Sequence, residues 1–159
     1  MKKILVLAAA GMCIAFTSCL KSGSESQGCQ AKSPQSEETV ITNFCTSHNI
    51  NAQKDANGIY YEITNAGQGV KPTASSKVFV TYKGTLLTDT QFDAQTDASK
   101  TGWTLGGLIP GWQVALPYIS KGGSIRMVLP SYLGYGCYAN GPIPANSPLY
   151  FEITLVDVQ

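Results

Sequence analysis

The chain has 159 residues, enough for one domain with appendages, and its hydrophobic fraction of 43% is ordinary for a globular protein. The formal net charge is +1, and it becomes −1 if the two lysines at positions 2 and 3 leave with a leader peptide. No basic patch or charge run is present, so we expect no nucleic-acid partner.

Residues 1–18 have the organisation of a signal peptide. A positive start precedes the apolar run Ile4–Phe16, which is shorter than the roughly 20 residues that a membrane-spanning helix needs. The run ends in Phe16-Thr17-Ser18-Cys19, which resembles the lipobox of bacterial lipoproteins, with Phe16 in place of the usual Leu. We therefore expect Cys19 to be a lipid attachment site that anchors the chain to a membrane. The alternative is an ordinary signal peptide that happens to contain Cys19.

The next segments are predicted to be a tether and a helix. Residues 19–35 are rich in Ser, Gly, Gln and Lys, a composition typical of a flexible linker, here lipid-anchored. Residues 36–57 are predicted to be a helical segment, with acids in the first turn and a stop within Asn49–Asn57. Four apolar side chains fall on one helical face: Val40, Ile41, Phe44 and Cys45. We expect this amphipathic helix to pack against the following domain or against a second copy of the chain, and the oligomeric state is left open.

The remaining residues, 58–159, read as one domain of strands. β-rich runs cover 59–64, 77–87, 124–130 and 149–158, and the apolar residues 111–116 predict one short helix. Val78, Val80 and Tyr82 share one face of their strand. In the last strand, Phe151 and the alternate residues after it point inward. The expected fold class is α+β, an antiparallel β-sheet wrapping one short α-helix, preceded by the N-terminal amphipathic helix.

Three cysteines remain once the leader and the lipid site are set aside: Cys29, Cys45 and Cys137. Export would place them in an oxidising compartment, where a disulfide persists. Cys29 and Cys45 are close in sequence and precede the domain, so they are the preferred pair, with Cys45–Cys137 as the alternative. A single histidine and scattered thiols cannot complete a zinc site, and we expect no metal and no cofactor.

Six short strings occur in an order and spacing that resemble the FKBP-type peptidyl-prolyl cis/trans isomerases over residues 58–159. They are Val80-Thr81-Tyr82-Lys83-Gly84, Gln91-Phe92-Asp93, Leu108-Ile109-Pro110-Gly111-Trp112, Gly134-Tyr135-Gly136, Ile143-Pro144-Ala145-Asn146-Ser147 and Leu149-Tyr150-Phe151-Glu152. Each string alone is weak, because aromatic residues in strands usually form core. The set of six is specific.

The resemblance implies an FKBP-like fold and a pocket for a proline ring. Trp112 would form its floor, and the other substrate-binding positions would be Phe92, Trp103, Leu108, Ile109, Ile143 and Phe151. The catalytic residues would be Tyr135, Asp93 and Tyr82. Tyr135 and the Ile109 N–H would donate to the substrate carbonyl, and Asp93 would lie beside Tyr82 at a polar edge. The resemblance implies proline-containing exported polypeptides as substrates and makes macrolide inhibitors candidate ligands.

The sequence departs from the family pattern at two positions near the pocket. A basic residue often follows the Phe-Asp pair and bonds to the Asp, and here the nearest candidate is Lys100. The second proline of the usual Ile-Pro-Pro is replaced by Ala145. These departures concern inhibitor affinity and sequence preference more than the fold.

Three other functions compete with catalysis of proline isomerisation. A chaperone module on the same fold would bind proline-containing segments with little or no catalysis, although retention of Tyr135 and Trp112 favours activity. A hydrolase is disfavoured, because the only imidazole, His48, lies on the predicted N-terminal helix without a nucleophile motif nearby. A lipid-anchored adhesion protein would leave the ordered set of aromatic residues without a reason.

Overall fold

The computed structural model describes residues 29–159. The expected signal peptide (1–18) and the expected lipid site Cys19 lie outside the described residues, as does the first part of the expected tether. Within the described residues, no helix is long and apolar enough to cross a membrane.

One antiparallel sheet forms the centre of the fold, in the order β1-β2-β6-β7-β3-β4, with the short β5 also paired to β3. The strands are β1 (Gln53–Lys54), β2 (Tyr60–Asn65), β3 (Lys77–Leu86), β4 (Gln91–Gln95), β5 (Trp103–Thr104), β6 (Ser124–Leu129) and β7 (Leu149–Val158). The four predicted strands correspond to β2, β3, β6 and β7. The sequence analysis missed β1, β4 and β5, because runs of two to five residues carry too little alternation.

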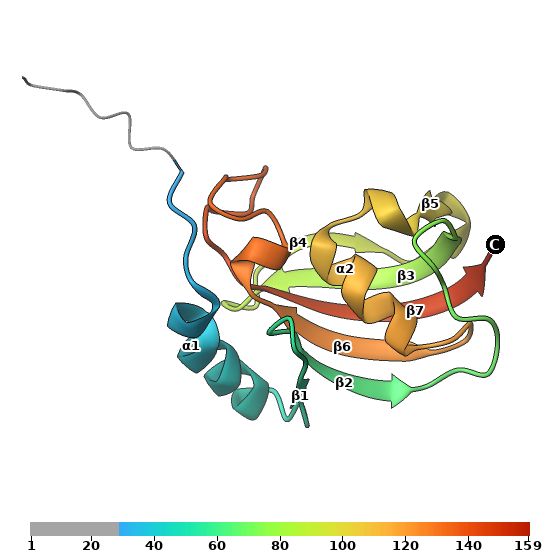
Figure 1. Cartoon of the computed structure of the whole chain (residues 1–159), viewed down its shortest axis with the longest axis horizontal. Coiled ribbons are helices and arrows are strands. Elements are labelled where there is room, and N and C mark those ends of the chain that lie inside the picture. Colours follow the sequence, from blue (N-terminus) through green and yellow to red (C-terminus); the bar gives the residue numbers. More distant parts are fainter. Residues whose placement is uncertain (1–28) are drawn as a thin grey trace, which may run out of the picture.

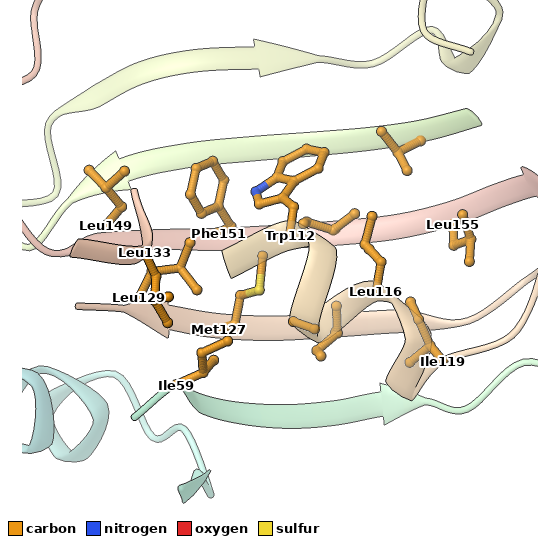
Figure 2. Packing of buried hydrophobic residues seen from close by; sticks show 14 of the residues in the cluster. Ile59, Trp112, Leu116, Ile119, Met127, Leu129, Leu133, Leu149, Phe151 and Leu155 are labelled. Atoms are coloured by element: carbon orange, nitrogen blue, oxygen red, sulfur yellow. The ribbon is translucent and has the colours of Figure 1, made fainter. Parts of the chain in front are cut away.

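The main core lies between the sheet and α2 (Pro110–Ala115), which crosses one face of the sheet (Figure 1). Pro110 stands at the first helical position, where its missing N–H costs nothing. Trp112 in the helix and Leu116 directly after it face the sheet residues Met127, Phe151 and Leu155 in Figure 2. The predicted short helix and the α+β fold are confirmed.

The helix α1 (Pro34–Ser47) lies at one end of the sheet (Figure 1). Its contacts place it on the face opposite to α2. Its buried apolar residues Ile41, Phe44 and Cys45 contact Tyr60, Val128 and Tyr150. Alternate residues of a strand point to opposite faces of the sheet. Tyr60, Val128 and Tyr150 alternate with the strand residues that pack beneath α2, so they lie on the other face. The helix therefore packs against its own domain, the first of the two predicted arrangements.

Two details of α1 differ from the prediction. The Ser33 side chain accepts a hydrogen bond from the Ser36 N–H, so the helix is capped at Ser33 and begins at Pro34 rather than at Ser36. Val40 is 48% exposed, whereas Glu37 is 1% exposed. Positions 37, 41, 44 and 45 project to one side of an α-helix, and position 40 lies beyond the edge of that row.

The predicted disulfide Cys29–Cys45 is wrong, and so is its alternative, because the structure pairs Cys29 with Cys137. The Cα atoms of the pair are 5.3 Å apart. Cys45 is a free, buried thiol on the sheet-facing side of α1. The backbone of residues 30–32 is hydrogen-bonded to the Asn146 side chain, so this part of the expected flexible tether is held against the domain. Closeness along the chain was the wrong guide to this pairing.

Replacing both Cys29 and Cys137 with Ser is expected to lower the free energy of unfolding by about 4 kcal/mol, because the disulfide joins residues separated by 108 positions and restricts the unfolded chain. Chemical denaturation with and without reductant measures this effect. A Cys45→Ala variant is the control and should remain sensitive to reductant. Unfolding of the wild type that ignores reductant would contradict the pairing.

Candidate active site

Nine of the ten predicted pocket residues line one open cavity of about 240 Å³. They come from β3, β4, β5, β7, α2 and two loops, and they are Tyr82, Phe92, Asp93, Trp103, Leu108, Ile109, Trp112, Tyr135 and Phe151. Long-range strand pairing therefore gathers residues that are up to about seventy positions apart in sequence. The tenth, Ile143, is 4% exposed and packs in the main core. A backbone bridge between Asn140 and Ile143 holds it there.

The floor of the cavity is made of aromatic rings in edge-to-face contact. The ring centroid of Trp112 lies 5.2 Å from that of Tyr82 and 5.4 Å from that of Phe151. Phe92 meets Phe151 at 5.6 Å, and Trp103 meets Tyr82 at 6.0 Å. Edge-to-face pairs are a favoured arrangement of aromatic side chains, so these contacts fix the shape of the cavity.

Gly84 allows two of these rings to approach the sheet. A Cβ atom at this position would lie 2.7 Å from Phe92 and 2.8 Å from Phe151, closer than carbon atoms can pack. Gly84 pairs with Asp93 next to a register shift between β3 and β4. The sequence analysis gave it no role, although a glycine inside a strand is a signal of close approach.

A phenol and a carboxylate form the polar edge of the cavity. The Tyr82 hydroxyl donates to Asp93 Oδ2 at 2.6 Å, and the Ala94 N–H donates to Asp93 Oδ1 at 2.8 Å. Burial is the main cause that raises the pKa of Tyr82 well above its ordinary value, and the hydrogen bond to Asp93 adds to it. Tyr82 is therefore a neutral hydrogen-bond donor near neutral pH.

Among residues 29–159, no basic side chain bonds to the Asp93 carboxylate. Lys100 instead lies 3.9 Å from Asp97 at the end of a short turn. The cavity edge therefore carries one carboxylate, which accepts hydrogen bonds from the Tyr82 hydroxyl and from the Ala94 N–H.

Two loops complete the mouth of the cavity. Gln113 Nε2 donates to the Leu108 carbonyl at 2.7 Å, which ties the Leu108–Ile109 segment to the start of α2. On the other loop, Tyr135 is 36% exposed and contributes to the cavity lining. Its neighbour Gly136 has φ 62, a left-handed conformation that glycine adopts without strain.

Catalytic groups of other kinds lie elsewhere or are not gathered. His48 Nε2 contacts Asp89 Oδ1 at 2.8 Å, and its Nδ1 contacts the Phe44 carbonyl, so its ring is engaged at the end of α1. Among residues 29–159, no three His, Cys, Asp or Glu side chains are arranged to hold a metal ion.

Residues 68–156 match the family described as FKBP-type peptidyl-prolyl cis-trans isomerase. The isomerase FkpA of Escherichia coli strain K12 is 42% identical over 103 residues, which are 64% of this chain and 38% of FkpA. The outer membrane protein MIP of Legionella longbeachae is 38% identical over 104 residues, which are 64% of this chain and 45% of MIP. The chain thus spans less than half the length of these relatives.

Solved structures of peptidyl-prolyl cis-trans isomerases agree with these sequence matches. The crystal structure of E. coli FkpA superimposes with a TM-score of 0.64 at 31% identity, covering 79% of this chain and 62% of FkpA. A peptidyl-prolyl cis-trans isomerase from Pseudomonas syringae pv. tomato superimposes with a TM-score of 0.66 at 29% identity, covering 82% of this chain and 98% of that one. The chain belongs to the family of FKBP-type peptidyl-prolyl cis-trans isomerases.

The polar edge gives a titration test. An Asp93→Asn variant should show a lower pKa of Tyr82 than the wild type, because the carboxylate charge that opposes the phenolate is gone. The pKa should stay above the ordinary value of about 10, because burial remains. The raised pKa stabilises the fold below pH of about 10, and this contribution is lost as pH rises through the pKa of the folded state.

Ultraviolet absorbance of phenolate, recorded against pH, measures this shift. Each protein is compared with its own Tyr82→Phe version, so that the other tyrosines subtract out. Identical Tyr82 titrations in the wild type and in Asp93→Asn would show that the carboxylate has no influence on the phenol.

Proposed function

We propose that this chain is a peptidyl-prolyl cis/trans isomerase that accelerates rotation about X–Pro bonds without covalent chemistry. The observation that supports this most strongly is the convergence of nine family-matching residues on one cavity with an aromatic floor and a polar edge. At about 240 Å³, the cavity has room for a proline ring and part of its neighbours.

An apolar cavity can catalyse this rotation because of the electronic structure of the amide. Partial double-bond character imposes a barrier of roughly 18–20 kcal/mol. Uncatalysed exchange therefore takes tens to hundreds of seconds. A twisted amide has lost resonance and much of its carbonyl dipole, so removal from water favours it over the planar ground state. Fixed donors and a complementary shape add binding that exists only in the twisted state.

The proposed roles carry over the family pattern to the side chains that line the cavity. Trp112 holds the proline ring from below, and Tyr82, Phe92, Ile109 and Phe151 surround it, with Leu108 and Trp103 at the rim. The Tyr135 hydroxyl and the Ile109 N–H donate to the substrate carbonyl. Asp93 orients the Tyr82 hydroxyl, to which it is hydrogen-bonded. Macrolides that fill this cavity would act as competitive inhibitors.

A Tyr135→Phe variant is expected to lower kcat/KM by roughly tenfold, the equivalent of one hydrogen bond of about 1.4 kcal/mol. Asp93→Ala should cause a loss of similar size by freeing Tyr82. Cis-to-trans kinetics on short X-Pro-Phe peptides measure both effects. Tyr138→Phe is the matched control, because Tyr138 is 71% exposed and does not line the cavity.

Two outcomes would separate this proposal from its main alternative. Acceleration by the wild type that weakens in Tyr135→Phe but not in Tyr138→Phe supports the isomerase. A folded wild type that binds proline peptides but accelerates none of them, across several X residues, would instead identify a binding module.

We further propose that the chain is exported and anchored in the bacterial cell envelope through a lipid on Cys19, where it acts on exported polypeptides. The Cys29–Cys137 disulfide supports export, because such bonds persist in oxidising compartments. The similarity to an outer membrane protein, MIP, is consistent with the envelope.

A Cys19→Ala variant tests the anchor. The wild type should incorporate labelled fatty acid and partition with membranes, whereas Cys19→Ala should lose both properties, because one thiol carries the lipid. Cys45→Ala is the control and should behave like the wild type. A wild type that is exported without label and recovered in the soluble fraction would indicate an ordinary signal peptide.

A further inference from the structure

Residues 29–37 contact the loop that carries Tyr135 at three separate places. This loop runs over residues 130–148, between β6 and β7, and its regular structure is limited to the single-turn helix Ser131–Leu133 and the bridge between Asn140 and Ile143. Residues 29–37, called the strap below, lie outside the part of the chain that matches the family, residues 68–156. The contacts made by the strap are therefore additions to the family domain.

The first contact involves a buried acid. Glu37 is 1% exposed although glutamate is almost never fully buried without a partner. Its Oε2 atom accepts a hydrogen bond from the Ser131 backbone N–H at 2.8 Å, whereas its Oε1 atom is buried without a partner among the described residues. A carboxylate removed from water in this way costs free energy. Such a cost indicates that the contact serves a purpose besides stability.

The carbonyl of Ser131 in turn holds the residues on both sides of Tyr135. The Ser131 carbonyl accepts hydrogen bonds from the N–H of Gly134 at 3.0 Å and from the N–H of Gly136 at 2.8 Å. These two glycines flank Tyr135 directly. Glu37 therefore holds the N–H of the same residue whose carbonyl holds both neighbours of Tyr135.

The other two contacts act on the far side of Tyr135. Cys29 is bonded covalently to Cys137, two residues beyond Tyr135. Asn146 donates its backbone N–H to the Gly136 carbonyl at 2.8 Å. Its side chain accepts from the Lys32 N–H at 3.2 Å and donates to the Gln30 carbonyl at 3.0 Å. The loop is thus held by the strap before and after Tyr135.

We propose that the strap, residues 29–37, sets the position of the Tyr135 hydroxyl for isomerisation, with Glu37 as its principal positioning residue. This inference rests on the proposed function, in which Tyr135 donates to the substrate carbonyl. Glu37 touches no substrate, and it acts through Ser131 on the backbone of Tyr135. An active-site tyrosine on a largely irregular loop needs such support, because a displacement of about 1 Å can reduce a rate by about a hundredfold.

The test compares Glu37→Ala with Glu38→Ala. Glu38 is the next residue on α1, and its carboxylate binds Lys54 Nζ at 2.7 Å and the Tyr60 hydroxyl at 2.6 Å, neither of which belongs to the loop. Glu37→Ala should lower kcat/KM for X–Pro peptides by about tenfold, a smaller loss than full displacement would cause. Glu38→Ala should leave it within about twofold. Glu37→Gln should recover most of the activity, because its amide oxygen can still accept the Ser131 N–H.

Two readouts distinguish positioning from a general loss of structure. The first adds Glu37→Ala to a Tyr135→Phe background. There Glu37→Ala should not lower kcat/KM further, because the hydroxyl that it positions is gone. The second is amide hydrogen exchange at Gly134 and Gly136, which should be faster in Glu37→Ala than in Glu38→Ala. If Glu37→Ala fails to fold, Asn146→Gly tests the strap through its contacts with Gln30 and Lys32, because it removes these side-chain contacts and keeps the left-handed φ of 55.

The outcomes are separable from those of the proposed function. An inactive wild type overturns the isomerase proposal, and exchange at Gly136 then decides whether the strap holds the loop. An active wild type in which Glu37→Ala and Glu38→Ala behave alike in rate and exchange overturns the strap. If Glu37→Ala lowers kcat/KM equally in the wild type and in Tyr135→Phe, Glu37 acts on another group, and this outcome also overturns the strap proposal.

Discussion

Close packing of α2 against the sheet is the constraint on which the rest of the structure depends. Gly111 brings the helix so near β6 that a Cβ atom there would lie 2.4 Å from Leu129, and Ala115 is fully buried. The helix has only six residues, so it covers part of the sheet and leaves a hollow beyond its first turn. Trp112 is 4% exposed and packs between the helix and the sheet. The same side chain forms the floor of that hollow. Fold and site therefore share one packing interaction.

The walls of the cavity follow the same logic. Phe151 is 2% exposed and belongs to the main core, yet its ring also forms cavity surface beside Phe92. Gly84 provides the space in which these two rings meet. A cavity whose walls are core side chains is rigid, because interiors are close-packed and resist rearrangement. Rigidity suits a reaction in which binding energy, rather than a nucleophile or a metal, would have to favour one shape of the substrate.

The mouth of the cavity is built differently from its floor. The loop that carries Tyr135 has little regular structure of its own, so contacts with distant residues must determine where the hydroxyl lies. Residues before the family-matching part supply these contacts, through the Cys29–Cys137 disulfide and the Glu37–Ser131 hydrogen bond. Residues 29–37 can thereby influence a site to which they contribute no lining residue.

The sequence by itself determined the four longer strands and the short helix, and its family strings implied nine of the ten predicted cavity residues. Alternation such as that of Val78 and Val80 reflects a local period of two, and the ordered family strings carry the cavity residues, so both can be read along the chain. Tertiary structure alone decided the partner of Cys29 and the burial of Glu37, an acid that the helical pattern placed in an ordinary first turn. Both depend on where the loop around Ser131 comes to lie, roughly a hundred residues away. Local patterns do not encode where this loop lies, because its position is set by the packing of the whole sheet.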